Sequence, residues 1–191
     1  PPKPSFDAFR GWAEKEGAKA LVPLSIQDFE GERGVAALET VEAGAAILQV
    51  PARMSLQVNT LSKPPRWFKD EDAWAASKWD HRLAMMVLHE DGDTDSELKP
   101  WLAQLPREFC TPTLSPGLLT ALDSIGCFGS VCKAARAQRE DWDTARLRAP
   151  ESPSQAQFDW AMSVVRSRSF SGPFTPSTFV GSLCALSLSL S

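Results

Sequence analysis

The feature that most constrains the fold of this 191-residue chain is a change in sequence texture partway along it. From Ala20 to Val58, short β-prone runs are interrupted by Gly31, Gly44 and Pro51. Beyond Asp80, apolar residues recur at helical spacing in segments bounded by Pro or Gly. Short runs between turn residues are typical of strands, whereas a period of 3.6 residues is typical of amphipathic helices. The sequence therefore predicts an α+β protein, with a β-rich part followed by a mainly helical part.

The expected elements of both parts are short. Strands are predicted at Ala20–Leu24, Gly34–Ala37 and Ala45–Val50. A first helix is predicted over Phe6, Phe9 and Trp12, ending at Gly17. Further helices are predicted for a segment capped by Asp80 and ended by Asp91–Asp93, and for Glu97–Gln104, Pro116–Ile125 and Val131–Asp143.

The best-marked helix of the sequence begins at Ser152-Pro153, with the proline in its first turn. Its stripe at helical spacing consists of Phe158, Ala161, Val165 and Arg168. The tail that follows mixes Pro, Ser, Thr and Gly and then alternates Ser with Leu, which is typical of an edge strand or of a frayed terminus. Its apolar stretch is far shorter than the roughly 20 residues that span a bilayer, so no membrane helix is expected.

Charge and residue counts exclude several classes of partner. A net charge of -4 argues against a broad basic surface, so we expect no nucleic acid partner. The only histidines, His81 and His89, are eight residues apart and do not form an i,i+4 metal pair; they are interpreted as surface or capping residues. The four cysteines form no C-x-x-C motif, so we expect no metal. Their spacing favours reduced thiols and an intracellular protein.

Five separated segments add information when they are taken together. They are, in chain order, Asp28–Ala37, Val41–Pro51, Leu98–Pro106, Phe158–Ala161 and Val165–Phe170. In this order they resemble the RuBisCO large-subunit methyltransferase branch of the SET-domain proteins. The resemblance extends from about Phe6 to about Ser171, and a Gly-rich turn alone would not support it.

The resemblance implies an architecture. It predicts an incomplete SET β-fold with a mainly helical insertion, which agrees with the order of strand-like and helix-like segments. The expected regions are an N-terminal helix at 1–19, a β-rich part of the SET domain at 20–60, the helical insertion at 61–170 and a divergent Ser/Leu-rich tail at 171–191.

The resemblance also implies a reaction, the transfer of a methyl group from S-adenosylmethionine to a lysine side chain of a protein substrate. The sulfonium methyl group and the neutral amine must be held in line, so positioning supplies much of the catalysis. A lysine must lose its proton first, and burial in an apolar channel lowers its pKa. The expected cofactor is S-adenosylmethionine and the expected partner is a protein.

Residues of this sequence that match the family's site are assigned by the same resemblance. The cofactor-binding set is Glu30, Gly31, Arg33, Gly34 and Arg168, and the substrate-binding set is Ser167, Arg168 and Phe170. Glycine lets the main chain approach a ligand, and Glu30 suits the cationic amino end of the cofactor. The simpler interpretations are an ordinary Gly-containing hairpin and basic residues, Arg166 or Arg168, that complement a helix C-terminus.

One departure from the family pattern limits the assignment. The sequence contains no tyrosine, and its only asparagine, Asn59, is not followed by histidine, whereas the family uses tyrosine hydroxyls and an Asn-His pair in its second β half. No catalytic residue is therefore assigned. The chain is interpreted as a truncated, inactive form of a protein-lysine methyltransferase. The alternative is a non-catalytic protein-interaction module on a partial SET scaffold.

Overall fold

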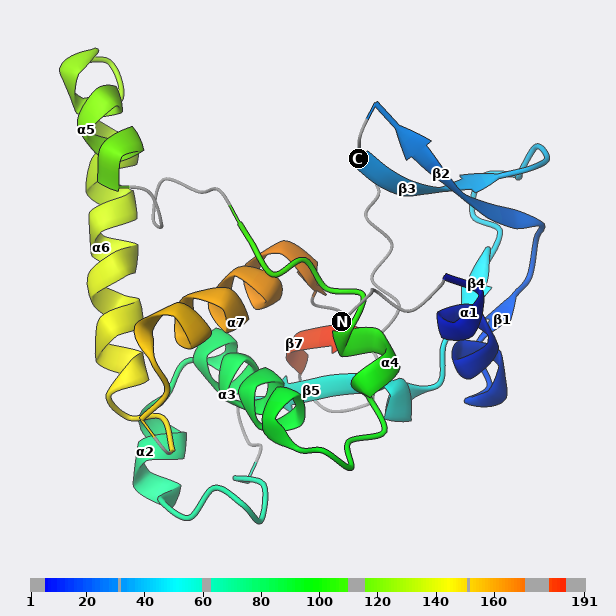
Figure 1. The fold of residues 1–191 in the computed structure, drawn as a ribbon, viewed down its shortest axis with the longest axis horizontal. Helices are drawn as coiled ribbons and strands as arrows, with labels where there is room; N and C mark the ends of the chain where they lie inside the picture. The colour runs from blue at the N-terminus through cyan, green and yellow to red at the C-terminus, as the bar shows by residue number, and fades with distance from the viewer. Residues whose placement is uncertain are drawn as a thin grey trace.

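The computed structural model describes residues 6–30, 32–59, 63–109, 116–150, 152–170 and 179–184. Within these residues an N-terminal helix precedes five short strands, and six more helices precede two final strands (Figure 1). The helices are α1 (Phe6–Lys15), α2 (Glu71–Ala76), α3 (Trp79–Gly92), α4 (Lys99–Leu102), α5 (Pro116–Ser124), α6 (Gly129–Arg146) and α7 (Gln155–Arg168). The strands are β1 (Lys19–Ala20), β2 (Leu24–Phe29), β3 (Glu32–Ala37), β4 (Leu48–Gln49), β5 (Ser55–Asn59), β6 (Ser169–Phe170) and β7 (Phe179–Cys184). The fold class is α+β, as the sequence predicts.

Three small antiparallel sheets divide the strands. Strand β1 pairs with β4, and β2 pairs with β3 in a hairpin. The third sheet has the order β5-β7-β6, so its central strand is the last one in the chain. This sheet joins segments from three of the regions expected from the sequence, because β5, β6 and β7 lie in 20–60, 61–170 and 171–191 respectively.

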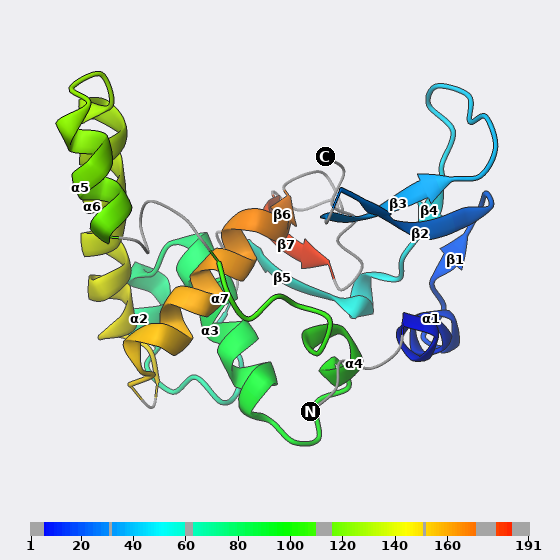
Figure 2. The ribbon, with the colours of Figure 1, turned by 45° about the horizontal axis from the view of Figure 1, so that its top comes forward.

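Helices α3 and α7 form the centre of the molecule and pack against each other and against the β5-β7-β6 sheet (Figures 1 and 2). Both helices are buried on most sides. Leu83, Ala84 and Val87 of α3 are fully buried, as are Phe158 and Val165 of α7. Burial of a large apolar side chain contributes roughly 1.5 to 3 kcal/mol, so this pair accounts for much of the core.

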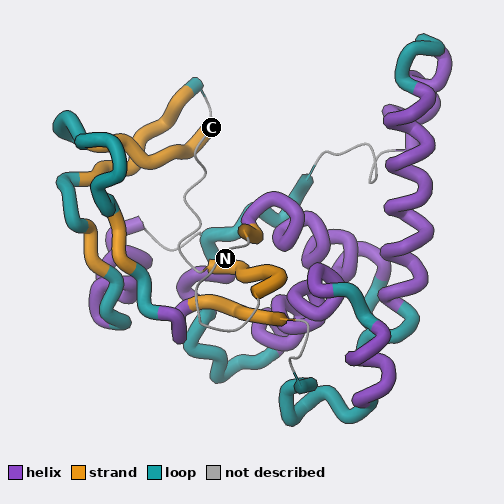
Figure 3. The backbone as a smooth tube through the Cα atoms, turned by 180° about the vertical axis from the view of Figure 1, so that it is seen from behind, coloured by secondary structure: helices purple, strands orange, loops and turns teal. Residues whose placement is uncertain are grey.

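Helices α5 and α6 form an antiparallel pair that projects from one end of the molecule, at the opposite end from the β2–β3 hairpin (Figures 1 and 3). Helix α6 joins the body through its second half, where Trp142 and Ala145 are buried. Its first half carries exposed residues such as Val131, which is 44% exposed.

Local sequence signals place most helices to within a few residues, and the caps of two helices differ from expectation. Helix α7 begins at Gln155 rather than at Ser152-Pro153, because Ser154 is the N-cap and forms a capping box with Gln157. Helix α3 is preceded by Lys78, and the expected cap Asp80 lies buried in its first turn. The α7 start is thus fixed by a local capping box, whereas no side-chain hydrogen bond caps the start of α3.

The strands deviate more from expectation than the helices do. The predicted strand Ala20–Leu24 is divided between the end of β1 and the start of β2, which continues to Phe29. Predicted strand Ala45–Val50 shrinks to β4, at Leu48–Gln49. In the tail, β7 is the central strand of its sheet, and the Ser/Leu alternation for which an edge strand or a frayed terminus was predicted lies outside the described residues.

Candidate functional site

The β2–β3 hairpin presents the first group of predicted site residues. Phe29 pairs with Glu32, so the chain reverses direction between these two residues, and Glu30 lies in the turn. Glu30 is exposed and has a φ of 56°, a left-handed conformation that is unfavourable for a residue with a Cβ but fits a tight hairpin turn. Gly31 and the Arg33 side chain lie outside the described part, while the Arg33 backbone pairs with Asp28.

Gly34 is the one buried residue among those of the hairpin whose burial is described. A Cβ added at Gly34 would lie 2.8 Å from Cε2 and 2.9 Å from Cδ2 of Phe29, closer than van der Waals contact allows. The Phe29 ring therefore covers this glycine across the hairpin. The resemblance led us to expect that a ligand approaches the main chain at Gly34. The space over Gly34 is instead taken by the Phe29 side chain, which is 46% exposed.

The end of helix α7 presents the second group. Ser167 donates a hydrogen bond to the Ser163 carbonyl oxygen over 2.7 Å. Arg168 is the last residue of α7; its Nη1 donates to Ser167 Oγ over 2.6 Å, and its guanidinium carbon lies 5.7 Å from the centre of the Phe109 ring. Phe170 is in β6, where its backbone pairs with Ser182, and its side chain lies outside the described part.

The structure brings Ser167 and Arg168 together, but it leaves the hairpin group apart from them. Figure 1 shows the turn of the β2–β3 hairpin well separated from the end of α7. Glu30 and Arg168 nevertheless carry the charges that complement the ammonium and carboxylate groups of an amino acid. The chemistry of these residues suits a zwitterionic ligand, and a ligand that contacts both groups must extend between them.

The other arginine of this turn has a structural role. Arg166 Nη1 lies 3.3 Å from Oδ2 of Asp80, a carboxylate that is only 6% exposed. Oδ1 of Asp80 accepts a hydrogen bond from the backbone N–H of His81. The pair joins the C-terminal turn of α7 to the first turn of α3. Arg166 thus pairs with a buried carboxylate, while the Arg168 guanidinium lies over the Phe109 ring. The two arginines that could each complement the helix C-terminus therefore have different partners.

His81 is not the surface or capping residue that the sequence suggested. It is 3% exposed, and its Nε2 lies 3.0 Å from Oδ2 of Asp141 on α6. Lys78 donates a hydrogen bond over 2.7 Å to the other oxygen of Asp141. Burial raises the pKa of the Asp141 carboxyl, but the hydrogen bond from Lys78 and the contact with His81 outweigh it and hold this pKa below its ordinary value. Spacing in sequence could not have revealed this contact, because 60 residues separate the partners.

His89 and the tryptophans serve packing. The His89 ring stacks on Trp67, with 4.2 Å between ring centres. Trp74, Trp101, Trp142 and Trp160 belong to the buried core, and Trp67 and Trp79 pack against it. These tryptophans are therefore core or packing residues.

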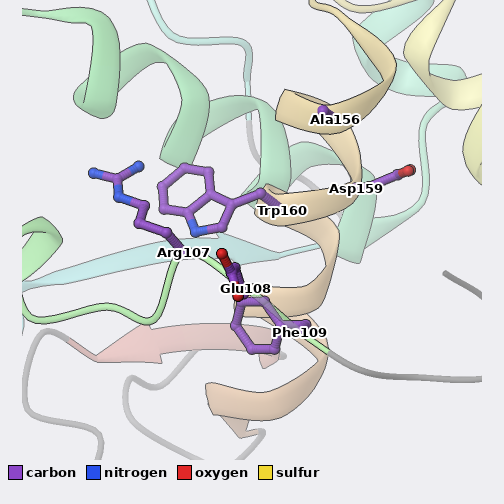
Figure 4. Close-up of a pocket in the computed structure, with 6 residues that line it drawn as sticks. All are labelled: Arg107, Glu108, Phe109, Ala156, Asp159 and Trp160. Carbon is purple, nitrogen blue, oxygen red and sulfur yellow. The ribbon is translucent and has the colours of Figure 1, made fainter. Parts of the chain in front are cut away.

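A pocket that the sequence did not indicate lies beside the first half of α7. It has a volume of about 360 Å³ and is lined by Arg107, Glu108, Phe109, Ala156, Asp159 and Trp160 (Figure 4). Trp160 Nε1 donates a hydrogen bond to the Pro106 carbonyl oxygen, and Arg107 stacks on the indole ring at 4.4 Å. The only hint in the sequence was that residues 107–109 directly follow the Leu98–Pro106 segment.

Among the described residues, no three His, Cys, Asp or Glu side chains gather in a way that would hold a metal ion. None of the helices in the described part combines the length and apolar character required to cross a bilayer.

Comparisons with known proteins identify the fold. No protein-family model matches the sequence, and no curated protein matches it at a significant score. Solved structures do match. The SET domain of LSMT bound to lysine and AdoHcy superposes with a TM-score of 0.74 at 21% sequence identity, covering 97% of this chain and 44% of that chain.

Two structures of Rubisco LSMT give similar results. The complex with sinefungin and monomethyllysine has a TM-score of 0.67 at 21% identity and covers 87% of this chain and 41% of that one. The complex with AdoMet has a TM-score of 0.61 at 22% identity and covers 86% and 40% respectively. The chain spans less than half the length of these solved chains. The strands, the helices between them and these superpositions together show that this chain has the SET-domain fold seen in Rubisco LSMT.

Proposed function

We propose that this chain forms part of a protein-lysine N-methyltransferase that uses S-adenosylmethionine. The observation that carries the proposal is the shared fold with SET-domain structures that hold AdoMet or AdoHcy and lysine or methyllysine. At 21% identity this likeness concerns the fold alone, so the residues at the end of α7 provide the second support. Arg168 forms a hydrogen bond to Ser167 there, whereas Arg166 forms an ion pair with Asp80.

In the proposed reaction the cofactor supplies an electrophilic methyl group, and the protein supplies position. When bound, the cofactor would supply this methyl group to a lysine amine that has already lost its proton. We propose that Arg168 holds the carboxylate and Glu30 the ammonium group of the cofactor, with the main chain at Gly31, Arg33 and Gly34 beside it. Ser167 and Phe170 are proposed to border the substrate.

The Phe29 ring enters this proposal because it lies over Gly34. A ligand that approaches the main chain at Gly34 must displace the ring or stack against it. Since Phe29 is 46% exposed and sits on an open hairpin, either change requires little rearrangement of the core.

A methyl-transfer assay tests the function. Labelled methyl transfer from S-adenosylmethionine to a cell extract is measured for the 191-residue chain and for the longest protein translated from its transcript. We expect labelling by the longer protein, reduced at least tenfold in its Arg168→Ala variant, because a charge-assisted hydrogen bond is lost. Arg148→Ala, which removes an exposed arginine elsewhere, is the matched control. Equal labelling by both variants would remove Arg168 from the site.

A second candidate function rests on the absence of tyrosine from the 191 residues. No other side chain combines the reach of a phenol with a hydroxyl donor, which favours a non-catalytic protein-interaction module for this chain by itself. We expect the 191-residue chain to transfer no methyl groups and to bind S-adenosylmethionine weakly or not at all in calorimetric titration. Low-micromolar binding by this chain would contradict that expectation and favour the enzyme.

A further inference from the structure

The pocket beside α7 differs from the proposed cofactor contacts in size and composition. A volume of about 360 Å³ is near the lower end for small-molecule sites, so it suits one long side chain better than a nucleoside cofactor. Its walls combine two aromatic rings, Phe109 and Trp160, with three charged residues. The identity of its occupant therefore depends on which of those charges lack a partner.

Two of the three charges are already neutralised. Arg107 forms two hydrogen bonds to the Asp91 carboxylate, over 2.8 and 3.1 Å. Asp159 accepts hydrogen bonds from Arg139 over 2.7 Å and from Gln155 over 2.9 Å. Figure 4 shows the Asp159 carboxylate pointing away from the rings of Trp160 and Phe109.

Glu108 carries the remaining charge. Its side chain is exposed, and within the described part of the chain it has no ion-pair partner. In the view of Figure 4 it lies between Trp160 and Phe109. A carboxylate beside aromatic rings is complementary to a cation, because the ring faces carry partial negative charge. Guanidinium groups already lie over both rings, from Arg107 at 4.4 Å and Arg168 at 5.7 Å.

We infer that this pocket binds a basic side chain, an arginine or a lysine, of the protein substrate, with Glu108 as its counter-ion. The substrate part of the inference rests on the proposed function. Phe109 connects the two sites, because it lines the pocket and its ring also carries the Arg168 guanidinium. A basic residue held here would lie against the first half of α7 and share Phe109 with Arg168, so the enzyme would select targets with a second basic residue near the methylated lysine.

The test uses the 191-residue chain and Nα-acetyl-arginine amide as the probe, followed by NMR at the indole N–H of Trp160. We expect a saturable shift of this signal with the arginine probe and none with the citrulline analogue, which has nearly the same shape but no charge. Glu108→Gln should weaken binding about fivefold, as expected for a solvent-exposed ion pair, and added salt should weaken it further. Glu97→Gln, an exposed glutamate outside the pocket, is the matched control.

Three results would overturn the pocket assignment: no saturable shift, an equal response to citrulline, or equal affinities in Glu108→Gln and the original chain. The titration contains no cofactor, so it is independent of the methyl-transfer assay. If the arginine probe binds but the longer protein transfers no methyl group, the proposed function is overturned, and so is the inference that the occupant belongs to a protein substrate. The inference that the pocket binds a basic side chain would stand.

Discussion

The α3–α7 pair and the β2–β3 hairpin are held together by different physical means. Each helix buries seven of its 14 residues, and Phe158, Ala161, Val164 and Val165 of α7 have no exposed surface. The hairpin consists of paired backbone, and its largest apolar side chain, Phe29, remains 46% exposed. Side-chain burial therefore stabilises the helices, whereas local backbone pairing stabilises the hairpin. Of the two groups of proposed ligand residues, one lies at the end of a rigid helix and the other on a pliable turn.

The largest expected effect compares one phenylalanine from each region. Phe158→Ala should lower the free energy of unfolding by about 3 to 5 kcal/mol, because it leaves a cavity where a fully buried side chain of α7 stood. Phe29→Ala should cost less than about 1 kcal/mol, because nearly half of the ring is already in solvent. Urea unfolding measures both. Similar losses for the two variants would show that the hairpin belongs to the core.

The next effect concerns the ion pair between α3 and α7. Asp80→Ala should cost about 2 kcal/mol, since it leaves the His81 backbone N–H and Arg166 without their acceptor. Arg166→Met should cost less than about 1 kcal/mol, because the Arg166 side chain is 50% exposed. A double-mutant cycle of unfolding free energies, measured in urea, gives the coupling energy between Asp80 and Arg166. A coupling of zero would mean that the pair does not fix the end of α7.

Asp141 tests the link between α3 and α6, and its effect depends on pH. Asp141→Asn should cost about 1 kcal/mol near neutral pH, a modest value because a third of the side chain is exposed. The pKa of the folded carboxyl is lowered, so its contribution is present above the ordinary value near 4 and is lost as pH falls through the folded-state pKa. Stability measured from about pH 7 to pH 2 should converge for the two proteins in acid. A difference in stability that stays constant over this pH range would contradict the stabilising role assigned to the ionised Asp141 carboxylate.

The smallest effect is expected on the hairpin. Gly34→Ala places a Cβ against the Phe29 ring, which is 46% exposed and can rotate away. The free energy of unfolding should therefore fall by only about 0.5 kcal/mol. The same substitution in a Phe29→Ala background should cost less, because the obstructing ring is gone. Urea unfolding of the four proteins checks the sign of this coupling. If Gly34→Ala is equally costly in both backgrounds, the ring does not cover the glycine.

The sequence by itself determined the fold class and most helices, because periodicity and capping residues act over a few neighbouring positions. It placed α5 at its observed start and α6 within a few residues, and the five separated segments indicated the SET fold that the structural comparison shows. It also placed Arg168 in the last turn of α7.

Only the tertiary structure decided which polar residues have partners. The contact between His81 and Asp141 and the contact between Asp80 and Arg166 join residues 60 and 86 positions apart, beyond the reach of any local pattern. The same holds for β7, which becomes a central strand because β5 and β6 lie on either side of it. The pocket around Glu108 likewise forms only when the segment after Pro106 lies along α7. Local spacing specifies helices and turns, whereas long-range packing specifies which charges remain available to a ligand.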